Sequence, residues 1–175
     1  MIDVENLLTH EQAELLANKI RKTYWDENKF PVDPVTIGRA LSIRIVDVQL
    51  PENVAGALLK KIGEDPVIML HADDPVNRKR FTLAHELGHY IYRMERGHFD
   101  DQEIDHVDHR NQDSRKGSDV EEISANRFAA SLLMPQDQVK LLCKSTVDVF
   151  ELSKFFEVST SAMKYRLNTL EIKCP

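Results

Sequence analysis

The sequence predicts an α+β fold, in which a small antiparallel β-sheet packs on a mainly helical core. A helical apolar pattern opens the chain, two strand-like segments joined by a turn follow, and helical patterns fill the rest. With 175 residues the chain is long enough for one hydrophobic core, so we expect a single domain over 1–175. Its expected parts are N-terminal helices (1–41), the sheet (42–71), two central helices (74–134) and a C-terminal helical segment (136–170).

The N-terminal part is predicted to hold two helices. The first covers about residues 11–25, and its apolar positions at helical spacing are Leu15, Leu16, Ala17, Ile20 and Tyr24. A segment with two prolines then breaks the chain. The second of these, Pro34, suits the first turn of a short helix that runs to Leu41.

The sheet is predicted from the segments that follow. Apolar residues alternate from Ile43, and the alternation slips by one residue at Val46, which is typical of a bulge or a strand end. The segments 54–62 and 67–71 flank Gly63-Glu64-Asp65-Pro66, which indicates a hairpin.

Helices are expected to dominate the remainder. Asp74 and Pro75 suit the N-cap and first turn of a long helix that ends near Met94. The polar segment 97–117 is predicted to be a loop, and the capping-box pattern at 118–121 begins a helix that ends before Pro135. Three short helices are then expected near 136–143, 147–156 and 160–169.

Composition narrows the class of protein. The net charge of −6 argues against binding of nucleic acid over a broad basic face. No stretch approaches the roughly 18–20 apolar residues of a membrane span, and the N-terminus lacks a secretory signal, so we expect a cytoplasmic protein without a membrane partner. Cys143 and Cys174 lack metal-type spacing; we expect two free thiols, with a disulfide between them as the alternative.

The segment His85-Glu86-Leu87-Gly88-His89 carries the candidate chemistry. Residues four apart on a helix share one face, so both imidazoles can bind one Zn²⁺. Glu86 is rotated by roughly 100° from His85, and from there it borders the metal without ligating it. Its carboxylate can take a proton from a water at the metal and pass it to a leaving amine. We therefore predict a zinc metallopeptidase with Glu86 as the catalytic residue.

A catalytic zinc needs a third protein ligand. The metzincin arrangement fails, because Tyr92 and Glu95 stand where it requires glycine and histidine. Histidines also occur in the predicted loop, but without regular spacing, and we interpret them as surface residues: His98, His106 and His109.

The helix that begins near residue 120 is the better source of the third ligand. Ala125 and Ala129 form a stripe of small residues that allows close approach to the zinc helix, and Glu122 lies on the same face. Glu121 is expected to pair with Ser118 in the capping box. We therefore prefer Glu122, with Glu121 as the alternative; a carboxylate from a separate helix is the gluzincin pattern.

Several blocks of the chain also carry a family resemblance. They are Pro31–Pro34, Val54–Ala57, Asn77–His89, Ala125–Pro135 and Ser161–Leu167. Together they resemble the ImmA/IrrE-type (DUF955-type) metallopeptidases of bacteria and their mobile elements. The resemblance implies His85 and His89 as ligands, Glu86 as catalytic, and a Glu just before the Ala-Asn pair as third ligand. It also implies a substrate class, namely helix-turn-helix repressors, cut in prophage or mobile-element induction or in stress response. The chain departs from many relatives in carrying Ser124 directly before that pair.

Two other functions are consistent with the sequence. The C-terminal segment resembles a helix-turn-helix, and Lys164, Tyr165 and Arg166 could face DNA. Because acidic residues there balance the basic ones, we expect these helices to complete the core or to dock a partner, and direct nucleic-acid binding is not expected. The third hypothesis is a non-catalytic, zinc-containing partner-binding protein. The sequence does not predict the oligomeric state.

Overall fold

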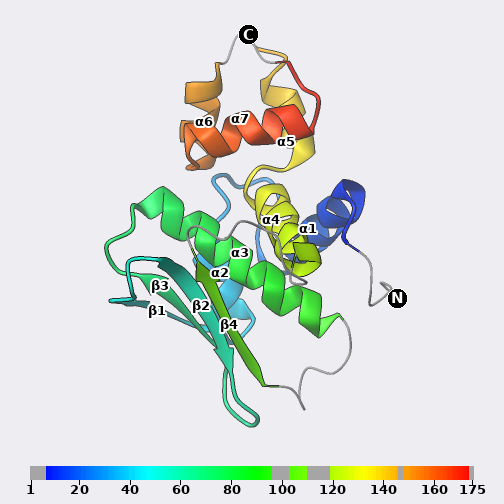
Figure 1. The fold of residues 1–175 in the computed structure, drawn as a ribbon. Coiled ribbons are helices and arrows are strands. Elements are labelled where there is room, and N and C mark those ends of the chain that lie inside the picture. The colour runs from blue at the N-terminus through cyan, green and yellow to red at the C-terminus, as the bar shows by residue number, and fades with distance from the viewer. Residues whose placement is uncertain (1–6, 96–102, 110–118, 146–147, 174–175) are drawn as a thin grey trace.

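The computed structural model describes residues 7–95, 103–109, 119–145 and 148–173. Within these ranges the chain has an α+β fold, as predicted (Figure 1). The elements, in chain order, are α1 (His10–Tyr24), α2 (Pro34–Ala40), β1 (Arg44–Val48), β2 (Val54–Lys60), β3 (Val67–His71), α3 (Val76–Met94), β4 (Ile104–His109), α4 (Asp119–Leu133), α5 (Gln136–Leu142), α6 (Val149–Phe156) and α7 (Thr160–Thr169).

The four strands form one mixed sheet in the order β1-β3-β2-β4. The predicted hairpin of β2 and β3 is confirmed, and β4 pairs antiparallel with β2. The sheet is not wholly antiparallel, because the hairpin places β3 beside β1 and these two strands run parallel. Neither the bulge nor the strand end considered for Val46 occurs, because β1 continues through this residue and pairs regularly over its five residues. A register shift occurs instead between Val54 and Gly56, opposite β4.

Strand β4 corrects the prediction of a loop over 97–117. Its backbone bonds to β2, which makes it an edge strand of the sheet among the described residues. Burial alternates along its first four residues: Ile104 is buried and His106 half-buried, whereas Asp105 and Val107 are exposed. The polar composition that indicated a loop is compatible with a strand whose inner face meets polar groups.

Helix α3 lies across the sheet and packs against α4 on its other side (Figure 1). The two helices approach closely at Gly88, where an added Cβ would lie 3.0 Å from Ala125 Cα. The small-residue stripe predicted on α4 therefore does meet the helix of the histidine motif. At its start α3 has Pro75 in the N-cap position without a side-chain hydrogen bond, and the expected cap Asp74 pairs with Arg78 at 3.7 Å.

Local signals explain the first two helices. Thr9 and Gln12 form a capping box at the start of α1, and Asp33 caps α2 ahead of Pro34. One apolar position of the α1 pattern does not face the core, since Leu15 is 63% exposed.

The C-terminal helices α5, α6 and α7 stack beside the end of α4 (Figure 1). Their buried apolar residues belong to the hydrophobic core, the packing role that the sequence favours over DNA binding. Arg166, a proposed phosphate contact, is only 2% exposed; its guanidinium pairs with Glu14 and donates to the carbonyl of Met134. Cys143 is disulfide-bonded, contrary to the expected free thiol, and the other cysteine of the chain, Cys174, lies outside the described residues. No helix in the described ranges is long and apolar enough to cross a membrane.

Candidate metal centre

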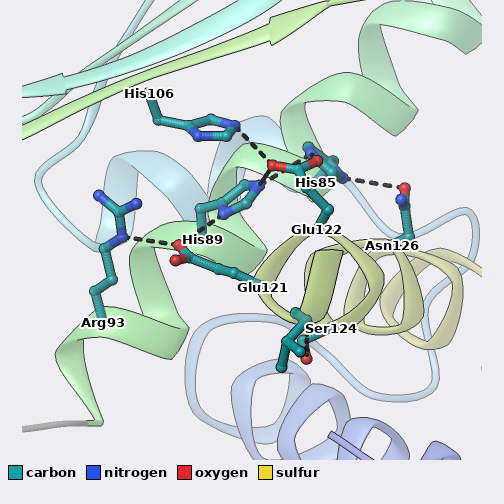
Figure 2. A network of polar contacts seen from close by, with 9 residues as sticks. His85, His89, Arg93, His106, Glu121, Glu122, Ser124 and Asn126 are labelled. Carbon is teal, nitrogen blue, oxygen red and sulfur yellow. Dashed lines mark hydrogen bonds and ion pairs between the residues drawn. The ribbon is translucent and has the colours of Figure 1, made fainter. Parts of the chain in front are cut away.

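The two histidines of the motif project from one face of α3, as the spacing predicts (Figure 2). Both are buried, and their Nε2 atoms lie 3.1 Å apart. The Nδ1 atom of His85 contacts Asn126 Oδ1 at 3.1 Å, and that of His89 contacts Glu121 Oε1 at 2.9 Å. Because amide and carboxylate oxygens only accept hydrogen bonds, both Nδ1 atoms carry the hydrogen. The Nε2 atoms are then free to bind a metal, while Asn126 and Glu121 fix the orientation of the two imidazole rings.

Glu122 extends from α4 to this pair of Nε2 atoms (Figure 2). Its Oε2 lies 3.3 Å from His85 Nε2, and its Oε1 lies 3.2 Å from His89 Nε2. Of the two glutamates weighed from the sequence, Glu122 is therefore the one whose carboxylate joins both metal-facing nitrogens.

Glu121 has two partners that the sequence did not predict. Its Oε1 accepts hydrogen bonds from His89 Nδ1 and from Arg93 Nε, the latter at 2.8 Å. The expected capping partner, Ser118, lies outside the described residues. Glu121 thus orients a ligand candidate, a role that the capping pattern does not predict.

His106 joins the same cluster from β4, although the sequence suggested a surface residue. Its Nε2 is 3.3 Å from Glu122 Oε1, and its ring centroid is 3.9 Å from that of His89. The other histidine of that strand, His109, points to a different partner, Asn53; His98 lies outside the described residues. The signal that could have identified His106 is the spacing of two between Ile104, His106 and Asp108, which is the period of a strand.

Glu86 is fully buried, and neither carboxylate oxygen has a hydrogen-bond partner among the described residues. Burial raises its pKa to about 8, an effect that the nearby His89 opposes and that Asp108 reinforces. A cation bound beside this carboxylate would favour the charged form and lower the pKa. Gly56 on β2 adjoins this side chain: an added Cβ there would be in ordinary contact with Glu86 Oε1 at 3.5 Å but would lie 2.6 Å from Thr82 Cγ2.

Among the other groups of the cluster, the lowered pKa values of Glu121, Glu122 and His106 suit a bound cation, whereas the raised pKa of His89 favours a proton on its ring. Hydrogen bonds from His89 and Arg93 outweigh burial and lower the pKa of Glu121 to about 2, while bonds from the two helix histidines likewise lower that of Glu122. Burial, aided by the charge of His89, lowers the pKa of His106 to about 4, so this ring is neutral at pH 7. For His89, burial lowers the pKa, but hydrogen bonds to Glu121 and Glu122 raise it overall.

This donor set fits a divalent metal ion. Candidate donor atoms of His85, His89, His106 and Glu122 all lie within 4.8 Å of one another. A tetrahedron with bonds of about 2.1 Å has edges of about 3.4 Å. The Nε2 atoms of His85 and His89 lie 3.1 Å apart and Glu122 Oε1 lies 3.2 Å from His89 Nε2, while the other oxygen, Oε2, lies 3.3 Å from His85 Nε2. In addition, the unpaired carboxylate of Glu86 needs a neighbouring positive charge or a donor. His85, Glu86 and Asp108 form a second, overlapping group.

The cluster opens into a cleft with walls from α3, β4 and α4. The residues that line it are Phe81, Thr82, His85, Val107, Asp108, His109, Glu122 and Asn126. A ligand in this cleft would meet the metal-facing side of His85 and Glu122 directly. The arrangement can therefore place a metal and a bound molecule together, with the fully buried carboxylate of Glu86 next to His85 and behind the lining of the cleft.

Comparison with known proteins agrees with this geometry. A search of curated proteins found no match. The profile of the IrrE N-terminal-like domain, Peptidase_M78, matches residues 40–168, which include the whole sheet, both metal-site helices and most of the C-terminal segment. Peptidases of this family depend on a metal, and the cluster described above could hold one. The match spans well over half of the 175 residues, and the chain therefore belongs to the IrrE N-terminal-like family of metallopeptidases.

Proposed function

We propose that the chain is a zinc-dependent endopeptidase that makes site-limited cuts in a helix-turn-helix repressor. The observation that supports it best is the convergence of His85, His89 and Glu122 beside the unpaired, buried carboxylate of Glu86. Two imidazoles and a carboxylate are the ligand set of gluzincin-type zinc enzymes. Tetrahedral coordination by histidine nitrogen and carboxylate oxygen is also common for catalytic zinc.

Each residue has a separate task in this proposal. Zinc, when bound, polarises the scissile carbonyl and makes a water acidic enough to be deprotonated near neutral pH. Glu86 accepts the proton of the attacking water and delivers it to the leaving nitrogen. Its oxygens are not engaged by any other described residue, so they are available for both transfers. Asn126 and Glu121 hold the two imidazoles with Nε2 toward the metal.

The cleft indicates how a substrate is bound. Strand β4 pairs with β2 on one side and forms one wall of the cleft, so an extended segment can lie along its other edge. A folded helix cannot bind in this way, because its carbonyls are already hydrogen-bonded within the helix. We therefore propose cleavage at an exposed loop or helix end of the repressor.

The substrate class rests on the resemblance to ImmA/IrrE-type peptidases and on family membership. In such a role the chain acts in the cytoplasm, where it releases genes of a prophage, a mobile element or a stress response. The sequence carries no pattern typical of a broad peptide-binding surface, which suits action on one partner rather than general degradation.

The test is to incubate the zinc-loaded chain with a helix-turn-helix repressor from a neighbouring gene and with casein, and to map products by mass. Glu86→Gln should retain zinc and lose cleavage, because an amide does not accept the proton. Glu95→Gln is the matched control: it makes the same change at the end of the same helix, where Glu95 pairs with Lys19. Rapid digestion of casein would contradict site-limited cleavage. A repressor that is bound but remains intact under every condition would favour a non-catalytic, partner-binding protein.

A further inference from the structure

His106 is the feature of the cluster that a three-ligand catalytic site does not require. It comes from β4, whereas the other candidate ligands come from α3 and α4. Its side chain is 15% exposed, and Nε2 is buried without a hydrogen bond among the described residues. A buried imidazole nitrogen without such a bond is costly unless another partner satisfies it.

The separations around Nε2 indicate what that partner is. Nε2 is 3.3 Å from Glu122 Oε1, which matches the tetrahedral edge of about 3.4 Å expected for zinc with bonds of about 2.1 Å. A donor atom of the His106 ring also lies within 4.8 Å of donor atoms of His85 and His89. Figure 2 shows His106 entering from the strand side, opposite the helix that carries Glu122.

We propose that His106 is a fourth protein ligand that closes the metal site of the resting chain, so that the peptidase is latent until this side chain withdraws. The inference rests on the metal site of the proposed function. Catalytic zinc sites keep one position for water or substrate, whereas sites with four protein ligands are closed. His106 occupies that open position, and its release exposes the metal to the cleft.

The position of His106 on an edge strand supplies a means of release. Its backbone is held opposite Leu58 of β2, while the other edge of β4 borders the cleft. A segment that pairs along this edge would contact the strand that carries the fourth ligand. Docking of the substrate and opening of the site are then coupled through one element.

The experiment uses the full chain loaded with Co²⁺ in place of zinc, because cobalt absorption reports both the coordination number and the donor atoms. The wild-type chain should show the intense visible bands of four-coordinate cobalt and bind acetohydroxamate, a metal-chelating probe, weakly. In His106→Ala a water oxygen should replace the imidazole nitrogen at the metal, so the cobalt bands should shift, and acetohydroxamate binding should tighten by about tenfold or more. Zinc affinity should fall by at least about tenfold, the lower end of what even a second-shell change costs.

Controls separate this proposal from the proposed function. His109→Ala removes the same side chain from the same strand, where it contacts Asn53, and should leave the cobalt spectrum unchanged. His106→Gln, which keeps a polar side chain of similar length, should reproduce the open spectrum if His106→Ala folds poorly. Unchanged spectra and probe affinity in both His106 variants, with one bound metal each, would overturn the fourth ligand alone. Failure of the wild-type chain to bind metal would instead overturn the metal site itself.

Discussion

Gly88 is where the structure predicts that one methyl group will disturb the metal site. An added Cβ would lie 3.0 Å from Ala125 Cα, 3.1 Å from Ala125 O and 3.2 Å from Phe128 Cδ1, whereas ordinary contact begins at 3.4 Å. Two of these atoms belong to the backbone of α4 and cannot rotate away. In Gly88→Ala, α4 must therefore move from α3 by about 0.4 Å, the difference between 3.4 and 3.0 Å.

The expected magnitudes follow from this displacement. Overpacking destabilises the fold by about 1–3 kcal/mol, and the higher helix propensity of alanine offsets about 1 kcal/mol of this loss. The free energy of unfolding should therefore fall by about 0–2 kcal/mol. Glu122 lies one helical turn before Ala125 and moves with α4. Metal–ligand distances tolerate about 0.2 Å, so zinc affinity should fall by about tenfold or more.

The assay is a competition titration for zinc together with urea unfolding of the metal-free chain. Gly38→Ala in α2 is the control, because its added Cβ meets the flexible end of Ile45 at 2.8 Å, and this side chain can rotate. Zinc affinity in the control should equal that of the wild type. If Gly88→Ala also binds zinc with wild-type affinity, close approach of α3 and α4 does not set the ligand geometry.

Three further predictions concern the site directly. His85→Ala should abolish stoichiometric zinc, measured by elemental analysis, and full zinc in this variant would remove His85 from the ligand set. Glu122→Ala should weaken zinc binding more than Glu121→Ala. In Glu121→Ala the zinc affinity should fall by about 10–100-fold, because His89 loses the hydrogen-bond partner of its Nδ1 atom. Equal losses of zinc affinity in the two variants would refute the assignment of Glu122 as ligand and Glu121 as its support. In the metal-free chain the pKa of Glu86 is raised from 4.5 to about 8, so the folded state binds more protons than the unfolded state between these values. The free energy of unfolding should therefore fall as pH rises from 5 to 8, and chemical denaturation should show a smaller fall in Glu86→Gln; parallel curves would refute this assignment.

The parts of the site that sequence predicted depend on local spacing. His85 and His89 share a face because they are four residues apart on one helix, whatever the rest of the chain does. Glu122 was predicted from its place relative to Ala125, a small residue that does meet Gly88 of α3. In both cases helical periodicity carries the necessary information, and the α+β class follows from similar patterns.

The parts that sequence mispredicted depend on tertiary contacts. Glu121 suits a capping box by its spacing from Ser118, but α4 lies where its carboxylate reaches His89 and Arg93. Hydrogen bonds from two nitrogens stabilise the carboxylate more than one cap does. The parallel pairing of β1 with β3 also depends on tertiary contacts. The hairpin pattern predicts that β2 pairs with β3, but it does not predict which further strand pairs with the free edge of β3.

Strand β4 has the composition of a loop because of what it faces. Of its inward positions, Ile104 reaches the hydrophobic core, while His106 and Asp108 reach the imidazoles and carboxylates of the metal cluster. An edge strand that lines such a cluster has no need for apolar alternation, and polar residues are favoured on its exposed edge. The period of two appears in the chemistry of the side chains rather than in their hydrophobicity, because the candidate metal-binding residues His106 and Asp108 alternate along the strand. A polar segment with histidine or acidic residues at that spacing, near a helical zinc motif, is therefore better interpreted as a strand that faces the metal than as a surface loop.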